Sequence, residues 1–125
     1  MLPRHLLPQI PNDEIDNFKN FVNSEGISSK IVYLPVKTLT PIQKHLSSDK
    51  VYALQKKLHE LGNPILISKD NIIMDGHHRW AATLAANEAN RIICLKFACS
   101  IKKLIELGHM FDGSEVKTVH EVSYL

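Results

Sequence analysis

Five consecutive residues, Asp75-Gly76-His77-His78-Arg79, bring together a carboxylate, a turn glycine, two imidazoles and a guanidinium. They follow two apolar, β-branched runs and lead into an alanine-rich stretch, so we expect a strand to end and a helix to begin here. Backbone N–H groups at a helix start and the donor fork of Arg79 both suit a phosphate oxyanion. The cluster therefore predicts a phosphate site. The plain alternative is a surface helix end, with Asp75 as its cap and Gly76 as its turn.

Phosphate chemistry at this cluster would use each residue type differently. Arg79 and the N–H groups after Gly76 would stabilise charge on the phosphate oxygens. One of the two histidines would act as general acid or base and the other would contact phosphate. Asp75 would orient a histidine or hold Mg²⁺ or another divalent metal. These residue types predict Asp75, His77 and His78 as catalytic residues and Asp75 as the metal ligand.

The elements that position the cluster follow from the spacing of apolar and turn residues. The runs 64–68 and 72–74 are typical of a β-hairpin that would deliver the cluster at its far end. Prolines 3, 8 and 11 predict an extended N-terminal arm over 1–11, which more readily completes the core than covers the site. We expect the other elements to be helices over 12–26, 47–62, 78–87 and 101–108, strands over 31–36 and 91–97, and a final strand or docking arm over 116–122.

Length and composition bound the class of protein. A chain of 125 residues fits one domain, and 44% hydrophobic with 22% charged residues is typical of a globular protein. The absence of an apolar run of about 20 residues and of a secretory signal predicts a cytoplasmic protein without a membrane partner. A net charge of +2 gives no strong sign of nucleic-acid binding. Cys94 and Cys99 fit no zinc or redox spacing, so we expect reduced, partly buried thiols.

The stretch around the cluster resembles the ParB/sulfiredoxin superfamily. Pro64-Ile65-Leu66-Ile67 is similar to its Pro-Ile strand, Gly76-His77-His78-Arg79 to its Gly-x-x-Arg turn, and Thr40-Pro41-Ile42-Gln43 to its Asn-Pro-x-Gln segment. The resemblance covers roughly residues 30–107 and implies an α/β (α+β) fold, with a small mixed sheet and flanking helices. It also implies that the turn surrounds a phosphate of a nucleotide or nucleic acid. The loop expected to face the same pocket adds three candidate ligand-binding residues, Pro41, Gln43 and His45.

The resemblance does not select one reaction, because the superfamily includes redox enzymes, partition proteins, serine kinases and DNases. Sulfiredoxins carry a nucleophilic cysteine where this chain has His77, which argues against that activity. The same position in the resemblance implies His77 as the general acid or base and leaves His78 to contact phosphate, with a nucleotide as ligand or substrate. We expect no chromosome-partition role, because 125 residues leave no room for the DNA-binding and dimerisation segments of partition proteins. The substrate-recognition region of the serine kinases is not recognisable in the sequence either. We therefore expect metal-assisted hydrolysis of a phosphodiester or nucleotide ahead of phosphoryl transfer. The alternatives are a non-catalytic nucleotide-sensing or DNA-binding module and a small-molecule kinase, and the sequence does not indicate an oligomeric state.

Overall fold

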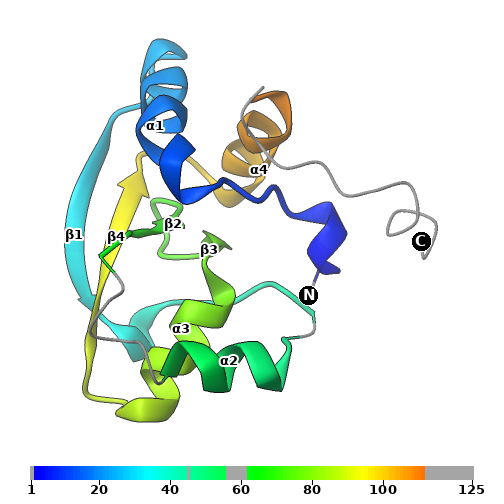
Figure 1. Cartoon of the computed structure of the whole chain (residues 1–125). Helices are drawn as coiled ribbons and strands as arrows, with labels where there is room; N and C mark the ends of the chain where they lie inside the picture. The colour runs from blue at the N-terminus through cyan, green and yellow to red at the C-terminus, as the bar shows by residue number, and fades with distance from the viewer. Residues whose placement is uncertain (1, 45, 56–61, 112–125) are drawn as a thin grey trace.

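A four-stranded mixed sheet forms the centre of the computed structural model, which describes residues 2–44, 46–55 and 62–111 (Figure 1). The strand order is β1-β4-β2-β3. β4 is antiparallel to β1 and parallel to β2, and β2 is antiparallel to β3. The strands are β1 (Ser29–Pro35), β2 (Ile65–Ile67), β3 (Ile73–Asp75) and β4 (Arg91–Phe97). The predicted α+β class and the predicted hairpin are both confirmed.

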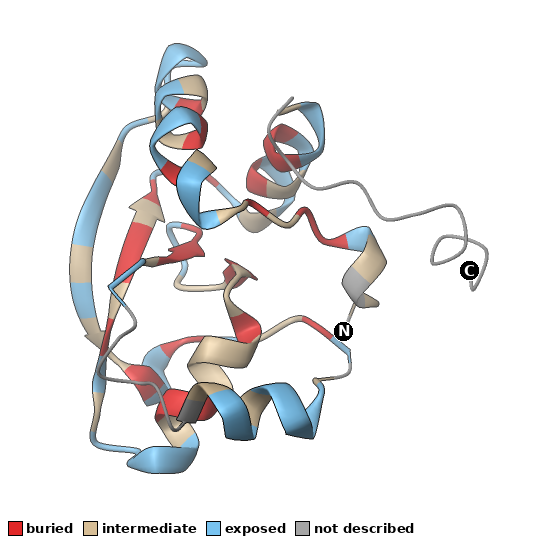
Figure 2. Cartoon of the chain, in the orientation of Figure 1, coloured by how far each residue is buried: buried red, intermediate tan, exposed pale blue. Residues whose placement is uncertain are grey.

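Helices cover both faces of this sheet (Figures 1 and 2). They are α1 (Ile15–Ser24), α2 (Ser48–Gln55), α3 (His77–Ala86) and α4 (Ile101–Met110), with short 3-10 turns η1 (Arg4–Leu6), η2 (Asn12–Glu14) and η3 (Val36–Thr38). Alternate residues of a strand point to opposite faces. Accordingly Leu95 packs in the core under α1 and α4, whereas the preceding Cys94 packs in a second core with Trp80 of α3. Trp80 and Leu84 of α3 thus pack on the face of the sheet opposite α1 and α4.

The predicted helices are confirmed in place but differ at their ends. α1 begins after η2, and α3 begins at His77, one residue ahead of the expected start. The prediction that the last helix stops at Gly108 is wrong, because α4 continues to Met110. Parts of two predictions, helix residues 56–61 and the segment 116–122, lie outside the described residues. None of the described helices is long and apolar enough to cross a membrane.

The N-terminal arm docks on the domain instead of extending away from it. Leu7 and Ile10 are only 2% and 5% exposed, so the arm completes the core as expected. It is not extended throughout, because η1 interrupts it. The N–H of Leu2 donates to the carbonyl of Ile42, and the N–H of Lys44 donates to the carbonyl of Leu2 at 2.6 Å. The arm is therefore fixed both to the core and to the loop ahead of α2.

Gly108 of α4 provides a test of this docking. A Cβ at position 108 would lie 2.3 Å from Cγ and 2.8 Å from Cβ of Pro8. Glycine to alanine inside a helix normally stabilises a protein by roughly 0.5–1 kcal/mol. Here we expect Gly108→Ala to lower the free energy of unfolding by about 1–3 kcal/mol, as overpacking does. Urea unfolding measures the change. A variant as stable as the parent, or no recovery when Pro8→Gly is added, would contradict the docked position of the arm.

Candidate phosphate-binding site

Gly76 joins β3 directly to α3, and the geometry requires glycine for two separate reasons. Its φ of +106° lies in a region that L side chains rarely adopt. A Cβ there would also lie 2.4 Å from Cγ2 and 2.8 Å from Cβ of Ile65 in the adjacent strand β2. The turn therefore presses the start of α3 against the sheet.

His77 is an interior residue with an occupied ring nitrogen. Its side chain is 2% exposed, and Nε2 accepts the N–H groups of Ile42 at 3.0 Å and Gln43 at 3.2 Å. Nε2 is therefore unprotonated, and the neutral ring carries its hydrogen on Nδ1. Burial, and secondarily the neighbouring His78, lower the pKa of His77 to about 4. His77 is neutral near pH 7 and holds the loop ahead of α2 against α3.

His78 binds the same loop farther along. Its Nε2 accepts the N–H of Ser47 at 3.0 Å. Together the two histidines hold Ile42, Gln43 and Ser47 beside the start of α3, as the resemblance predicts for this loop. Gln43 is 4% exposed, so its amide lies in the interior. Pro41 is half-buried just before it, and the predicted site residue His45 lies outside the described residues.

Asp75 and Arg79 face each other across the turn. Oδ2 of Asp75 accepts the N–H of Ile10 at 2.8 Å, which ties the arm to the end of β3. One terminal nitrogen of Arg79 donates to the carbonyl of Asn63, whereas its buried Nε–H has no hydrogen-bond partner among the described residues. Burial lowers the pKa of Arg79, and the charge of Asp75 opposes that shift. An arginine nevertheless stays charged in a protein.

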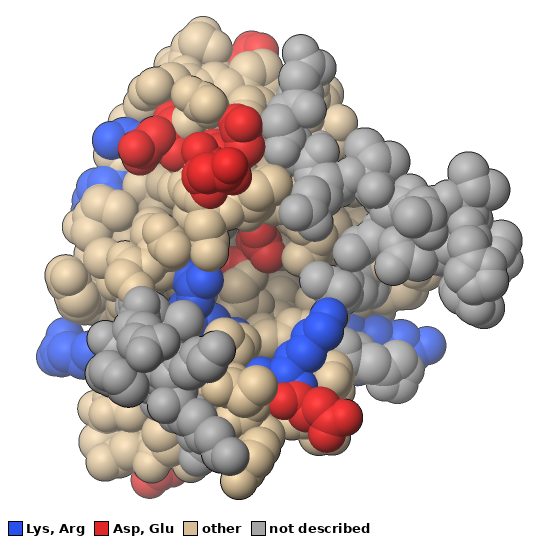
Figure 3. Space-filling view, in the orientation of Figure 1, with Lys and Arg blue, Asp and Glu red and all other residues tan. Residues whose placement is uncertain are grey.

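A cleft of about 320 Å³ lies between the arm and the start of α3, and Figure 3 shows the hollow on this face. The described residues that line it are Gln9, Ile10, Pro11, Asn12, Ile15, Pro64, Leu66, Asp75, Gly76 and Arg79. Four predicted site residues are not among them, namely Pro41, Gln43, His77 and His78. His77 and His78 instead hold the loop ahead of α2. The sequence favours completion of the core over coverage of the site for this arm. Its role as a wall of the cleft through residues 9–12 depends on the bond from Ile10 to Asp75, which joins residues 65 positions apart.

This architecture occurs in a solved structure. The Pnob8-like ParB-N domain matches with a TM-score of 0.54 and 13% sequence identity, over 66% of this chain and 35% of that chain. The chain has a ParB-like fold. The fold predicted from the resemblance is therefore confirmed, and this chain aligns with about a third of the ParB-N chain. No protein-family model and no curated protein matches the sequence.

Within this ParB-like fold, the cleft does not form a metal cage. Among the described residues, no group of three or more His, Cys, Asp or Glu side chains lies close enough to hold a metal ion. Asp75 is the only acid among the described lining residues, its Oδ2 already accepts a hydrogen bond, and Arg79 lies beside it. This donor set does not fit a resident divalent cation. The metal-ligand role of Asp75 stays a sequence-based prediction.

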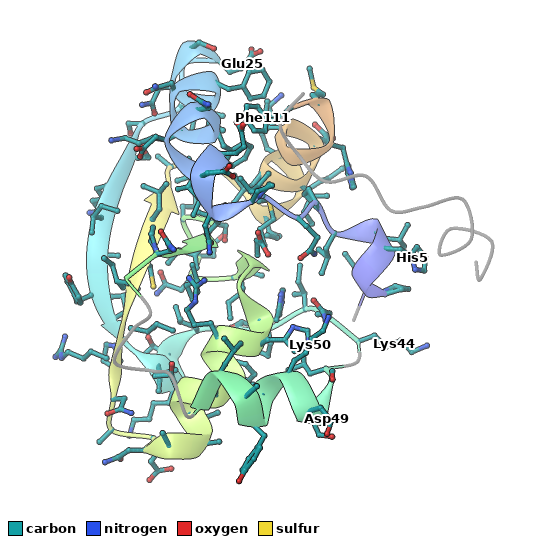
Figure 4. All side chains as sticks on the ribbon, in the orientation of Figure 1. His5, Glu25, Lys44, Asp49, Lys50 and Phe111 are labelled. Atoms are coloured by element: carbon teal, nitrogen blue, oxygen red, sulfur yellow. The ribbon has the colours of Figure 1, made fainter. Side chains whose placement is uncertain are left out.

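Charge around the cleft of the ParB-like fold is divided between its two sides. Acidic atoms gather over η2 and the start of α1, where the residues are Asp13, Glu14 and Asp16 (Figure 3). Lys44 and Lys50 lie on the α2 side together with the acid Asp49, as Figure 4 shows. An anionic ligand is therefore repelled at η2 and the start of α1, whereas the charges on the α2 side are mixed.

Proposed function

We propose that the cleft binds a phosphate group of nucleic acid and that the domain acts by binding. The observation that carries this proposal is the guanidinium of Arg79, which lines the cleft and whose buried Nε–H has no partner among the described residues. An unsatisfied buried donor costs free energy, and a charged one costs more. A phosphate oxygen in the cleft would form a charge-assisted hydrogen bond with this guanidinium.

The start of α3 supports the same ligand. The helical ladder begins where the N–H of Trp80 donates to the carbonyl of Gly76 at 2.9 Å, so the earlier amides have no acceptor inside the helix. The described first turn of α3 holds no acid and includes Arg79. A cation near a helix N-terminus is unfavourable on its own, whereas an anion bound there is stabilised by both the helix and the guanidinium.

The remaining residues of the cluster take positioning roles in this proposal. His77 and His78 hold the 42–47 loop through their Nε2 atoms. Asp75 fixes the arm, and its charge partly offsets the lowering of the Arg79 pKa by burial. Binding fits this geometry better than proton transfer by His77, because Nε2 of that residue is already engaged. Hydrolysis and phosphoryl transfer stay predictions of the sequence alone.

A nucleotide is the second candidate ligand, favoured by the acidic residues beside the cleft. Asp13, Glu14 and Asp16 would repel a polyanion that crossed η2 and α1. A single nucleotide would avoid that side. Salt distinguishes the two ligands, since a nucleic-acid complex releases many counterions and weakens steeply with added salt.

Thermal unfolding with nucleoside mono-, di- and triphosphates and with short DNA, each with and without Mg²⁺, tests the proposal. A ligand at about 100 times its dissociation constant adds about 2.7 kcal/mol, which raises the midpoint by roughly 10 °C. We expect this shift to fall by at least half in Arg79→Ala, because a ligand bound tenfold more weakly adds only about 1.4 kcal/mol. Arg91→Ala is the matched control, because Arg91 also donates to a backbone carbonyl, that of Tyr33 at 3.3 Å. An undiminished shift in Arg79→Ala, or no shift with any ligand, would overturn the proposal.

A further inference from the structure

A second cleft, of about 270 Å³, lies where β1 begins and β4 ends, near α1 in Figure 1. Three lysines from three different elements line it: Lys30 of β1, Lys96 of β4 and Lys69 of the turn after β2. The other described lining residues are Ser28, Ser29, Phe97 and Ala98. The described lining therefore contains three positive charges, two hydroxyl groups and no acid.

The lysines are held together by the sheet and are not merely close on a flexible surface. Lys30 is directly opposite Lys96 in the antiparallel register of β1 and β4. The N–H of Ala98 donates to the carbonyl of Ser28 at 2.9 Å, which makes Lys30 and Lys96 a hydrogen-bonded pair with Cα atoms about 5.5 Å apart. Like charges directly opposite each other destabilise a sheet. This pair therefore carries an electrostatic cost in the unliganded protein.

Neighbouring elements increase the positive potential. The N–H of Lys69 donates to the carbonyl of Cys99 at 3.0 Å, so the turn is fixed beside the end of β4. α4 begins there with Lys102 and Lys103 in its first turn and no acid in that described turn. Basic residues at a helix start are unfavourable, because the helix N-terminus is itself positive. The exposed Asp70, which follows Lys69 in the same turn, is not among the described residues that line the cleft.

We propose that this three-lysine cleft is a second phosphate site, which contacts the sugar-phosphate backbone of nucleic acid. The inference rests on the proposed function for the choice of nucleic acid as the source of phosphate. Lysine ammonium groups bind phosphate as point charges, and a phosphate between Lys30 and Lys96 removes their mutual repulsion. Three separate lysines suit a backbone contact that does not depend on base sequence.

The decisive variant is Lys30→Glu, because it should raise the stability of the domain while it weakens DNA binding. A loss of binding in this variant therefore cannot be explained by a loss of structure. It converts a like-charge pair into an opposite-charge pair, so we expect the thermal midpoint to rise by a few degrees. We expect the same variant to bind duplex DNA about tenfold more weakly at 0.1 M salt, with the slope of log K against log salt reduced by about one. Lys69→Glu should weaken binding similarly. Lys37→Glu is the control, since it makes the same charge change at an exposed site on η3.

Two probes separate failure of this inference from failure of the proposed function. Unchanged DNA affinity in Lys30→Glu and Lys69→Glu, relative to Lys37→Glu, would overturn the inference even where Arg79→Ala abolishes binding. Inorganic tripolyphosphate is the second probe, read from the NMR shifts of the Ser28 and Ala98 amides. Shifts with tripolyphosphate but no binding of DNA would overturn nucleic acid as the source and support a site for small phosphates. No response to either probe would overturn the site itself.

Discussion

Gly76→Ala is expected to lower the free energy of unfolding by about 3–5 kcal/mol, a large part of the stability of a small domain. Backbone strain at positive φ contributes about 1–3 kcal/mol, and overpacking contributes a similar amount. Both apply here, because φ is +106° and a Cβ would lie 2.4 Å from Cγ2 of Ile65. Urea unfolding measures the loss. We also expect ligand-induced stabilisation to disappear, since the start of α3 must move away from β2.

Gly26→Ala is the matched control for the steric part of this effect. Gly26 has a φ of +85°, but none of the atoms described lies within 4 Å of a Cβ placed there. We expect it to lose only about 1 kcal/mol, from backbone strain. Equal losses in Gly26→Ala and Gly76→Ala would show that α3 does not press on Ile65, and would remove the geometric basis of the cleft.

His77→Gln should remove a large part of the acid sensitivity of the domain. The pKa of His77 is lowered from 6.5 to about 4 in the folded protein, so the unfolded chain takes up this proton first as the pH falls. Its contribution to stability is therefore complete above about pH 6.5 and is lost as the pH falls toward 4. Between pH 7.5 and pH 4.5 the loss amounts to about 2.5 kcal/mol. A glutamine carbonyl can still accept the amide N–H groups of the loop, but it does not titrate.

Urea unfolding of both proteins at several pH values tests this expectation. The parent should lose about 2.5 kcal/mol more than His77→Gln between pH 7.5 and pH 4.5. The same replacement at the exposed His109 controls for the change of side chain. Parallel pH dependences of the parent and His77→Gln would contradict the buried, neutral state of His77. His77 would then again be a candidate general acid or base.

Elements whose signals are local could be predicted from the sequence. The two β-branched runs that form β2 and β3 are separated by a short turn, and Gly76 lies between a strand and a helix, as predicted for the turn glycine of the cluster. Pro35 lies at the end of the edge strand β1, as a residue without an N–H donor requires. Asp75, Gly76 and Arg79 do line one cleft.

Features that depend on contacts between distant residues could not be predicted in this way. His77 looks like part of a polar cluster, yet it contacts an amide 35 positions away. Its helical spacing with Trp80 and Leu84, which pack in the core beside α3, was the available signal that His77 faces inward. Likewise the arm could be assigned to the core, but its role as a cleft wall depends on the distant carboxylate of Asp75.

The most direct test of the central claim is a calorimetric titration of the ligand that gives the largest thermal shift. Parent, Arg79→Ala and Arg91→Ala are titrated at one salt concentration. A charged hydrogen bond between Arg79 and phosphate is worth about 1.5–3 kcal/mol, so we expect Arg79→Ala to bind at least tenfold more weakly. Arg91→Ala should bind like the parent. If Arg79→Ala and Arg91→Ala both bind like the parent, the phosphate does not lie at the start of α3.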